Sequence, residues 1–419
     1  MDGLSQLSLL LILLMEIAVL TFLEYKAWKT IYTPLCCLML PYAVVLLITI
    51  AIAGNFGFAR FNYESLYVWI YGLLFFALPS QVFATFLRYS GKPVKGPIID
   101  KSESLPPIFI AIAAVLVALL MYKLFQTLSS GLFLFGTDDF AEEFSGTGLW
   151  AHLREMLTPL LIISLYYVRK NQYWLWALIA LMLFIQFSFM VKGTIIIATA
   201  SALLMRMYAG RMHLSLTLII GVIAGSFGVF LLIYMVLPLL GNDGEADMFL
   251  LEFIAKHFIH YLTSGTMGWS YDIDQNIPDR NEFVHIIAPF HNIYSMLSGG
   301  ELVSSVNPFY WNTGITNTNV RTFFGTLYIY SDTLQFITTT LVISNVIYLI
   351  KAIALSTRNI YVYTIHFYYC GLLAMGWFEF YFFHLAIIEG PIVILLLALI
   401  AKDNRTSNES AADRKEVAV

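Results

Sequence analysis

Acidic and histidine side chains gather in one polar stretch of an otherwise apolar sequence, residues 241–322, here called the long loop. It contains Asp272, Asp274, Glu282 and His291. A carboxylate or imidazole can act as a general base when it reaches the proton to be removed. Each could equally be an ordinary loop acid or a structural histidine. Their spacing does not match that of a zinc site, so we expect acid–base chemistry with no metal and no cofactor.

Three consecutive aromatic residues, Phe309, Tyr310 and Trp311, follow in the long loop, with asparagine and threonine residues continuing to Asn319. Sugars present an apolar face of C–H groups and a rim of hydroxyls, which suits aromatic rings beside amide side chains. The same residues could instead anchor the chain at a membrane interface. We expect them to contact a carbohydrate.

Four cations, Arg154, Lys192, Arg280 and Arg321, lie in the segments that contain this chemistry or in shorter loops on the same side of the predicted membrane. A guanidinium group binds phosphate in bidentate fashion. A pyrophosphate group at the level of the lipid headgroups would explain these cations. Pairing with acids of the loop itself is the alternative.

Charged residues also fall within apolar runs. Asp332 is expected about 15 Å along a membrane helix that begins just after Arg321, at 1.5 Å rise per residue. Glu16 lies midway along the first apolar run. A charge at such depth is costly unless it is paired, so both are candidates for a functional role, and Asp332 for substrate binding.

The composition identifies the elements that must position these residues. The chain has 419 residues, of which 59% are hydrophobic and 12% charged, and its mean hydropathy is +0.77. Soluble domains are about 25% charged, so this composition is typical of a membrane protein. The net charge of -4 excludes a nucleic-acid-binding protein. The three cysteines, Cys36, Cys37 and Cys370, lie in apolar runs and form no metal-binding or disulfide pattern.

A bilayer core takes about 20 apolar residues of helix. About eleven such runs fit the sequence, which predicts an all-α polytopic membrane protein: 4–23, 34–53, 66–86, 107–128, 150–168, 173–191, 193–208, 214–240, 323–350, 360–383 and 385–401. We expect residues 1–401 to form a single membrane domain and residues 402–419 a disordered tail.

The basic residues indicate how these spans are oriented. With eleven spans, 16 of the 23 basic residues fall on one side, mostly in short loops, and seven on the other. Because cytoplasmic loops are rich in lysine and arginine, the C-terminus is predicted to be cytoplasmic and the N-terminus outside. The long loop and the smaller loop 129–149 are then extracytoplasmic.

Short motifs in and after the long loop resemble those of a known family. They are Tyr261-Leu-Thr-x-Gly265, Asn319-Val-x-Thr322 and Tyr330-x-Asp332. Together with many spans and one dominant late loop, they resemble the Wzy-type polymerases, which join oligosaccharide repeat units of bacterial surface polysaccharides such as lipopolysaccharide O-antigen.

The resemblance implies a GT-C-type glycosyltransferase of the bacterial inner membrane that needs no metal. It would transfer a glycan from undecaprenyl pyrophosphate onto a second lipid-linked repeat unit. The implied partners are undecaprenyl-pyrophosphate-linked oligosaccharides, membrane lipid and a chain-length regulator protein. The four cations would stabilise the departing pyrophosphate, one of the four acid–base candidates would accept the proton of the attacking hydroxyl, and the aromatic run would seat the sugar.

Two other functions fit parts of the sequence. An O-antigen ligase uses a similar donor with a different acceptor, and His291-Asn292 favours it. A flippase or other transporter of lipid-linked oligosaccharides would also have many spans, but it should place charges deep within several helices.

Overall fold

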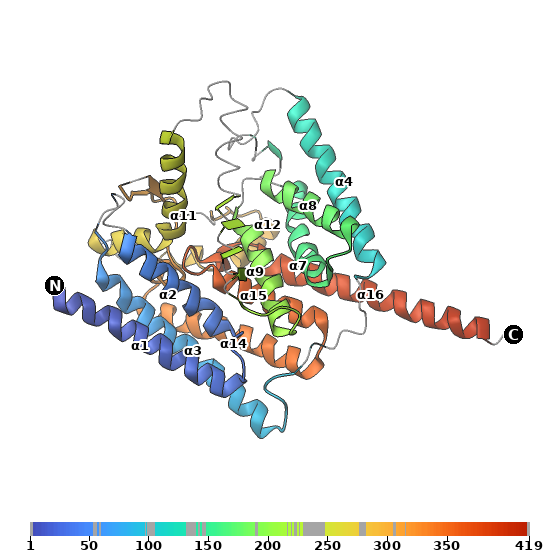
Figure 1. Ribbon diagram of the computed structural model, residues 1–419, viewed down its shortest axis with the longest axis horizontal. Helices are drawn as coiled ribbons and strands as arrows, with labels where there is room; N and C mark the ends of the chain where they lie inside the picture. The colour runs from blue at the N-terminus through green and yellow to red at the C-terminus, as the bar shows by residue number, and fades with distance from the viewer. Residues whose placement is uncertain are drawn as a thin grey trace. The chain divides into compact units, whose positions relative to one another are not determined.

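The protein is built almost entirely of α-helices in the part that the structure describes (Figure 1). The structure is a computed structural model. It describes residues 3–52, 57, 60–96, 98, 105–130, 140, 143–144, 148–188, 192–215, scattered positions between 217 and 228, and residues 248–275, 282–304, 307–314 and 316–416.

Five helices among the described residues are long and apolar enough to cross a membrane. They are α1 (Gly3–Trp28), α2 (Pro34–Ile52), α3 (Leu66–Tyr89), α4 (Pro107–Ser129) and α14 (Thr333–Thr357). They leave large apolar side chains such as Leu11, Val82 and Phe125 exposed. Water would oppose that exposure whereas lipid solvates it, so the predicted all-α membrane protein is confirmed at this level.

Shorter apolar helices account for most of the other predicted spans. They are α7 (Leu157–Tyr167), α8 (Tyr173–Ser188), α9 (Lys192–Tyr208), α15 (Ile360–Ala374) and the apolar part of α16 (Ala386–Glu416), which ends at Ala401. Each is shorter than the roughly 20 residues of a full crossing, so eleven spans remain a prediction. The predicted span 214–240 lies largely outside the described residues. Residues 402–416, expected as a disordered tail, continue α16.

The chain divides into two compact units. The first comprises residues 1–96, 210–356 and 369–385. Besides α1, α2, α3 and α14 it contains the 3₁₀ turns η2 (Tyr63–Ser65), η3 (Phe283–His285) and η4 (Tyr381–Phe383), the helices α11 (Met248–Asp274), α12 (Ala288–Ser298) and α13 (Phe323–Tyr330), and the strands β1 (Trp311–Asn312) and β2 (Asn317–Thr318).

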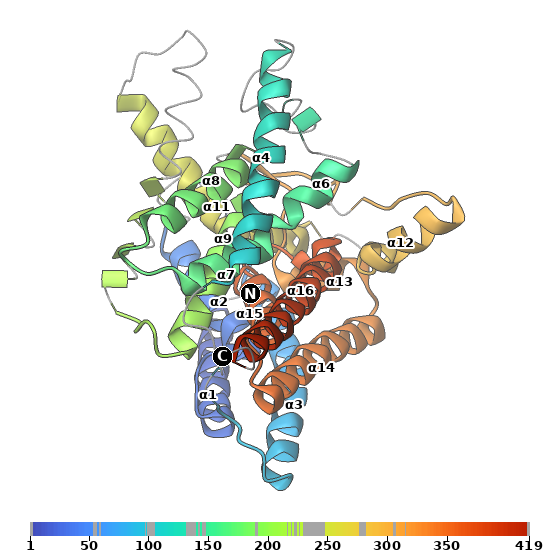
Figure 2. The same ribbon diagram turned by 90° about the vertical axis from the view of Figure 1, so that its right-hand side faces the viewer.

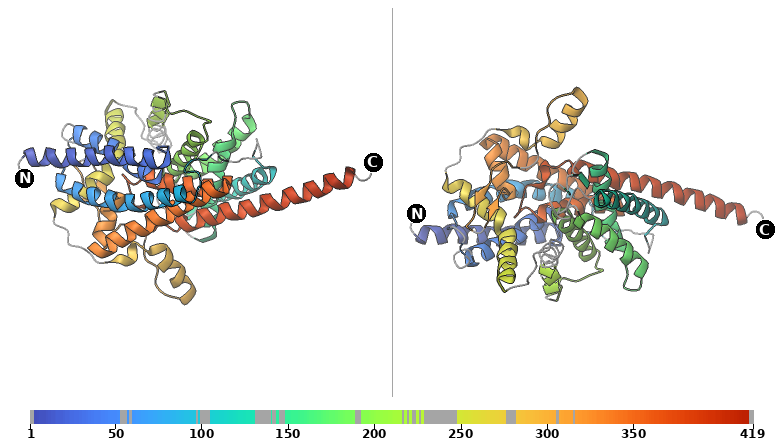
Figure 3. Two further views of the ribbon diagram at one scale, coloured as in Figure 1. Left: turned by 90° about the horizontal axis from the view of Figure 1, so that it is seen from below. Right: turned by 90° about the horizontal axis from the view of Figure 1, so that it is seen from above.

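Helices α1, α3 and α14 run side by side in this unit (Figure 3). A buried polar network joins them. Glu24 of α1 accepts hydrogen bonds from Ser80 of α3 and from Tyr348 of α14, the latter over 3.0 Å. The Trp28 indole donates to Ser80 over 2.8 Å. Because buried polar groups must be paired, this network fixes the register of the three helices.

The second unit comprises residues 97–209, 357–368 and 386–419. Helices α7, α8 and α9 pack together in it, with α4, α6 (Gly148–Glu155) and α16 in the same unit (Figure 2). Arg206 of α9 donates to the carbonyls of Leu165 over 2.7 Å and Val168 over 3.0 Å. It therefore satisfies carbonyl groups that the end of α7 leaves without a helical partner.

The predicted span 323–350 is two helices. Ser331 is in an extended conformation and separates α13 from α14. Asp332 follows the break, where its carboxylate accepts from the backbone N–H of Gln335 over 2.8 Å and the Gln335 amide oxygen accepts from the Asp332 N–H over 3.0 Å. Asp332 is exposed. The expectation that it lies deep within one helix was wrong, because the residue caps the start of α14.

Candidate functional site

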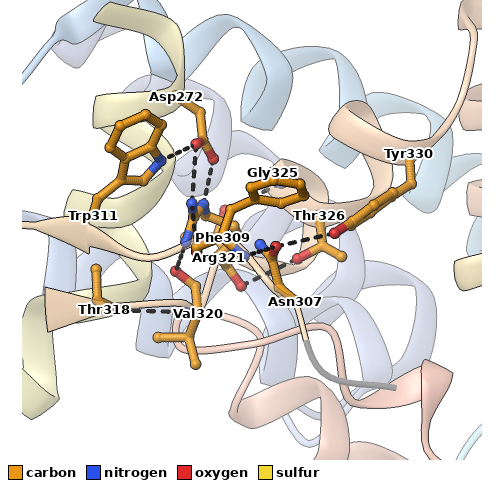
Figure 4. Close-up of polar contacts among 11 residues, drawn as sticks. Asp272, Asn307, Phe309, Trp311, Thr318, Val320, Arg321, Gly325, Thr326 and Tyr330 are labelled. Atoms are coloured by element: carbon orange, nitrogen blue, oxygen red, sulfur yellow. Dashed lines mark hydrogen bonds and ion pairs between the residues drawn. The ribbon is translucent and has the colours of Figure 1, made fainter. Parts of the chain in front are cut away.

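A buried ion pair forms the centre of the candidate site (Figure 4). Asp272 of α11 accepts from Nε of Arg321 and, over 3.0 Å, from Nη2 of the same guanidinium. The Trp311 indole donates to the same carboxylate over 2.5 Å. Asp272 is 3% exposed and Arg321 is 1% exposed. We call Asp272, Trp311 and Arg321 the acid–arginine centre.

The Arg321 guanidinium also donates hydrogen bonds to backbone carbonyls. Arg321 donates to the carbonyl oxygens of Val320 over 3.1 Å and of Phe309 over 3.4 Å. One side chain therefore ties α11 to both ends of the segment 309–320. The ion pair is buried and bidentate, which is the geometry that makes such a pair directional as well as strong.

Local sequence explains why this segment reaches α11. Trp311 pairs with Thr318 and Asn312 with Asn317 in the antiparallel strand pair β1–β2. A side chain at Gly268 would place its Cβ 2.5 Å from the carbonyl oxygen of Val320. Only glycine therefore allows α11 to lie against the strand pair.

Exposed groups surround the acid–arginine centre. Phe309 is 42% exposed and Tyr310 is 62% exposed. The Asn319 amide donates to the Tyr310 hydroxyl over 3.3 Å. These three residues, here called the aromatic rim, comprise two exposed rings and a half-buried amide that holds the Tyr310 hydroxyl. Trp311 instead turns its indole N–H inward to Asp272, so the aromatic run predicted to seat a sugar divides between the rim and the centre.

A buried histidine of α11 supports the strand pair. Nδ1 of His260 lies 3.0 Å from the Thr313 hydroxyl. Burial lowers the pKa of His260 to about 4, helped by the nearby His257, so the ring is neutral near pH 7. A neutral ring makes this contact without bringing a charge into the core. This contact was not predicted from the sequence.

Asp274 lies two residues beyond Asp272 but has different surroundings. Its Oδ1 accepts from the Asn62 amide over 2.7 Å. The backbone N–H of Asn62 donates to the Ser270 hydroxyl over 2.6 Å. Since residues two apart on a helix point to nearly opposite sides, Asp274 faces away from Arg321.

The other two acid–base candidates have local partners. Glu282 lies 3.2 Å from Nε2 of His285, and His291 lies 3.2 Å from the Ser295 hydroxyl. No contact given for the described residues links either one to Asp272. The structure therefore brings Asp272, Trp311 and Arg321 together and leaves Glu282 and His291 in a separate segment around α12.

The cations predicted to bind pyrophosphate do not form one described cluster. Arg154 pairs with Glu155 over 2.7 Å in the second unit. Lys192 begins α9, and its side chain lies outside the described residues, as does Arg280. Arg321 is buried and paired with Asp272. Its guanidinium therefore holds the segment 309–320 against α11, whereas direct contact with pyrophosphate was expected. The alternative, pairing with an acid of the long loop, describes Arg321, whereas Arg154 pairs with its neighbour Glu155 outside that loop.

Residues 57–407 match a family described as a family of unknown function, DUF6337. The chain belongs to this family. No curated protein and no solved structure matches the sequence. The DUF6337 match contains every residue of the acid–arginine centre and the aromatic rim, whereas α1 and α2 precede it.

One further polar cluster was missed in the sequence of this DUF6337 member. Lys351, predicted in a cytoplasmic loop, is buried within α14. Its Nζ lies 4.2 Å from the Trp28 ring centre and has no hydrogen-bond partner among the described residues. Glu24 is buried nearby and interacts with it electrostatically. The sequence signal for this cluster is a lysine within an apolar run. A positive charge in that position also indicates the end of a membrane span, which is how the sequence predicts a loop there.

Proposed function

We propose that the protein is a membrane glycosyltransferase that extends a bacterial surface polysaccharide. It would transfer a glycan from undecaprenyl pyrophosphate onto the non-reducing sugar of another lipid-linked repeat unit at the outer face of the inner membrane. The observation that carries the proposal is the acid–arginine centre, a rigid brace that presents the aromatic rim to the surroundings. Exposed rings held beside an amide are explained better by sugar binding than by a loop that binds no ligand.

Two contacts near opposite ends of α3 support one working face. The Asn62–Asp274 hydrogen bond joins the segment after α2 to the end of α11. At the end of α3 farther from Asn62, Arg88 donates over 2.7 Å to the carbonyl of Lys26 of α1. The basic-residue distribution had assigned Arg60 and the long loop to one side and Lys26 and Arg88 to the other. Each contact joins residues that are predicted on the same side, which supports the proposal of one working face.

The proposed reaction is a single displacement. The acceptor hydroxyl oxygen forms a bond to the anomeric carbon of the donor glycan, and the bond from that carbon to the pyrophosphate oxygen breaks. Its electron pair leaves with undecaprenyl pyrophosphate, and a base removes the hydroxyl proton. In this proposal Arg280 of the long loop remains a cation for the leaving group. Arg321 holds Trp311 and the rim in place instead.

Deleting the gene in a bacterium that carries it tests the proposal. Loss of a polymerase leaves a single repeat unit on the final acceptor, seen as one band in place of a ladder on a glycan gel. Loss of a ligase leaves the acceptor without glycan. An unchanged ladder would refute the proposal. The variant Tyr310→Ala should shorten the ladder, whereas Tyr173→Ala, an exposed tyrosine of the second unit, should not.

A transporter of lipid-linked oligosaccharides is a second candidate, and a specific observation favours it. Glu24 and Lys351 are buried inside candidate membrane helices, and the Glu16 carboxylate of α1 has no hydrogen-bond partner among the described residues. Intramembrane charges often mark a transport path. Cells lacking a transporter would accumulate lipid-linked repeat units at the cytoplasmic face, whereas cells lacking a polymerase would accumulate them outside.

A further inference from the structure

A small polar cavity lies beside the end of α11, on the side opposite the acid–arginine centre. Its volume is about 220 Å³, and it is lined by Gln6 of α1, residues 60–64 and Asp274. Pockets for drug-sized ligands measure roughly 300–1,000 Å³. The cavity is therefore the size of one small ring and too small for an oligosaccharide.

The walls of the cavity are held in place by hydrogen bonds rather than left as an open loop. Asn62 binds α11 twice, through its backbone N–H to Ser270 and through its amide to Asp274. Its amide oxygen accepts from the Glu64 backbone N–H over 2.9 Å and so caps η2. Phe61 is buried and packs edge-on against Tyr63 with ring centres 5.3 Å apart. The cavity is thus formed before any ligand binds.

Three charged groups at the cavity keep unused hydrogen-bonding capacity. Arg60 and Glu64 are exposed, and no side-chain partner is found for either among the described residues. Asp274 uses Oδ1 for Asn62 and keeps Oδ2 free of described protein contacts. Two carboxylates beside one guanidinium would repel a pyrophosphate. They suit a neutral ring with several hydroxyls, because carboxylates accept and guanidinium donates hydrogen bonds.

We infer that this cavity binds the terminal neutral sugar of the acceptor and that Asp274 is the base. This inference rests on the proposed function and deepens it. The acceptor hydroxyl gives its proton to the free oxygen of Asp274 as the new bond to the anomeric carbon forms. The proton then passes to water after undecaprenyl pyrophosphate has left. Of the four acid–base candidates, Asp274 alone lines this cavity.

The test uses the full-length protein in nanodiscs with two readouts. The first is binding of a lipid-free oligosaccharide of one repeat unit, prepared from the host polysaccharide and followed by saturation-transfer NMR. The second is the ladder that each variant restores to the deletion strain. The variants are Arg60→Met, which removes a donor, Gln6→Trp, which fills the cavity from α1, and Asp274→Asn, which keeps the shape but not the base.

We expect Arg60→Met and Gln6→Trp each to weaken binding at least tenfold. Asp274→Asn should bind within threefold of the unchanged protein yet fail to restore the ladder, because loss of a general base slows transfer about 10²- to 10⁴-fold. Lys256→Met, at the exposed pair with Glu252 on the same helix, is the matched control and should change neither readout.

The outcomes separate this inference from the proposed function. Suppose that the deletion strain lacks the ladder and that both Arg60→Met and Asp274→Asn restore a full-length ladder. This result would overturn the cavity assignment and leave the polymerase proposal standing. A deletion strain with a normal ladder would overturn both. Gln6→Trp checks the cavity independently, because it removes no charge, and normal binding in that variant would also overturn the assignment.

Discussion

Asp272 and Arg321 each depend on the other, because both are buried away from water. Removing one partner from a buried pair costs about 3–5 kcal/mol, since the remaining charge is uncompensated. We therefore expect Asp272→Asn to lower the melting temperature clearly and to release the Trp311 indole. Thermal unfolding in detergent, followed by tryptophan fluorescence, measures both effects. Lys256→Met should leave the melting temperature unchanged, because its ion pair is exposed. An unaltered melting temperature in Asp272→Asn would contradict a structural role for the pair.

His260 makes stability depend on pH. Burial lowers its pKa from 6.5 to about 4, so the unfolded chain binds a proton more readily than the folded one. The stabilisation from the neutral ring is complete above about pH 6.5 and is lost as the pH falls toward 4. We expect the melting temperature of the protein to drop more steeply across this window than that of His260→Gln. Parallel slopes for the two proteins would show that His260 does not titrate in this way.

Helix α12 exposes an apolar surface on an element with few neighbours. Phe290, Tyr294 and Leu297 are all exposed, Leu297 at 84%. Exposed apolar groups on a short helix of a membrane protein are typical of an interfacial helix. In Figure 2 the helix stands apart from α13 and α14 of its own unit. We infer that this face lies in the headgroup region of the bilayer.

Site-directed labelling tests the placement of α12. A polarity-sensitive dye on Leu297→Cys should report an apolar environment in nanodiscs, whereas the same dye on Asn312→Cys should report water. The native cysteines are buried and should not interfere. Equal emission from both positions would mean that α12 is not in the interface.

The break at Ser331 shows that an apolar run need not be one helix.

The orientation of the whole molecule is a prediction from its basic residues. An impermeant thiol reagent added to intact cells should label Glu301→Cys in the long loop and should not label Lys92→Cys after α3, because short cytoplasmic loops retain lysine and arginine. Labelling of Lys92→Cys alone would reverse the orientation and place the aromatic rim in the cytoplasm. That result would refute the proposed use of an outer-face lipid-linked donor.

The membrane character, the helical class and the segment that contains the aromatic run were all predictable from the sequence. These follow from local composition and periodicity, because lipid as solvent demands long apolar helices whatever their neighbours are. Four of the five long helices begin within a few residues of their predicted starts, α14 being the exception. The match to DUF6337 identifies a family whose function is unknown.

Which charges meet became clear from the packing of the helices and not from the sequence. Asp272 and Asp274 are nearly identical in sequence context, yet one is buried against Arg321 and the other faces the cavity of residues 60–64. Arg321 is 49 residues from Asp272 along the chain, and Asn62 is 212 residues from Asp274. Pairing over such separations depends on how the helices pack, which a local pattern does not encode. The same reason explains why Lys351 was placed in a loop although packing buries it beside Trp28.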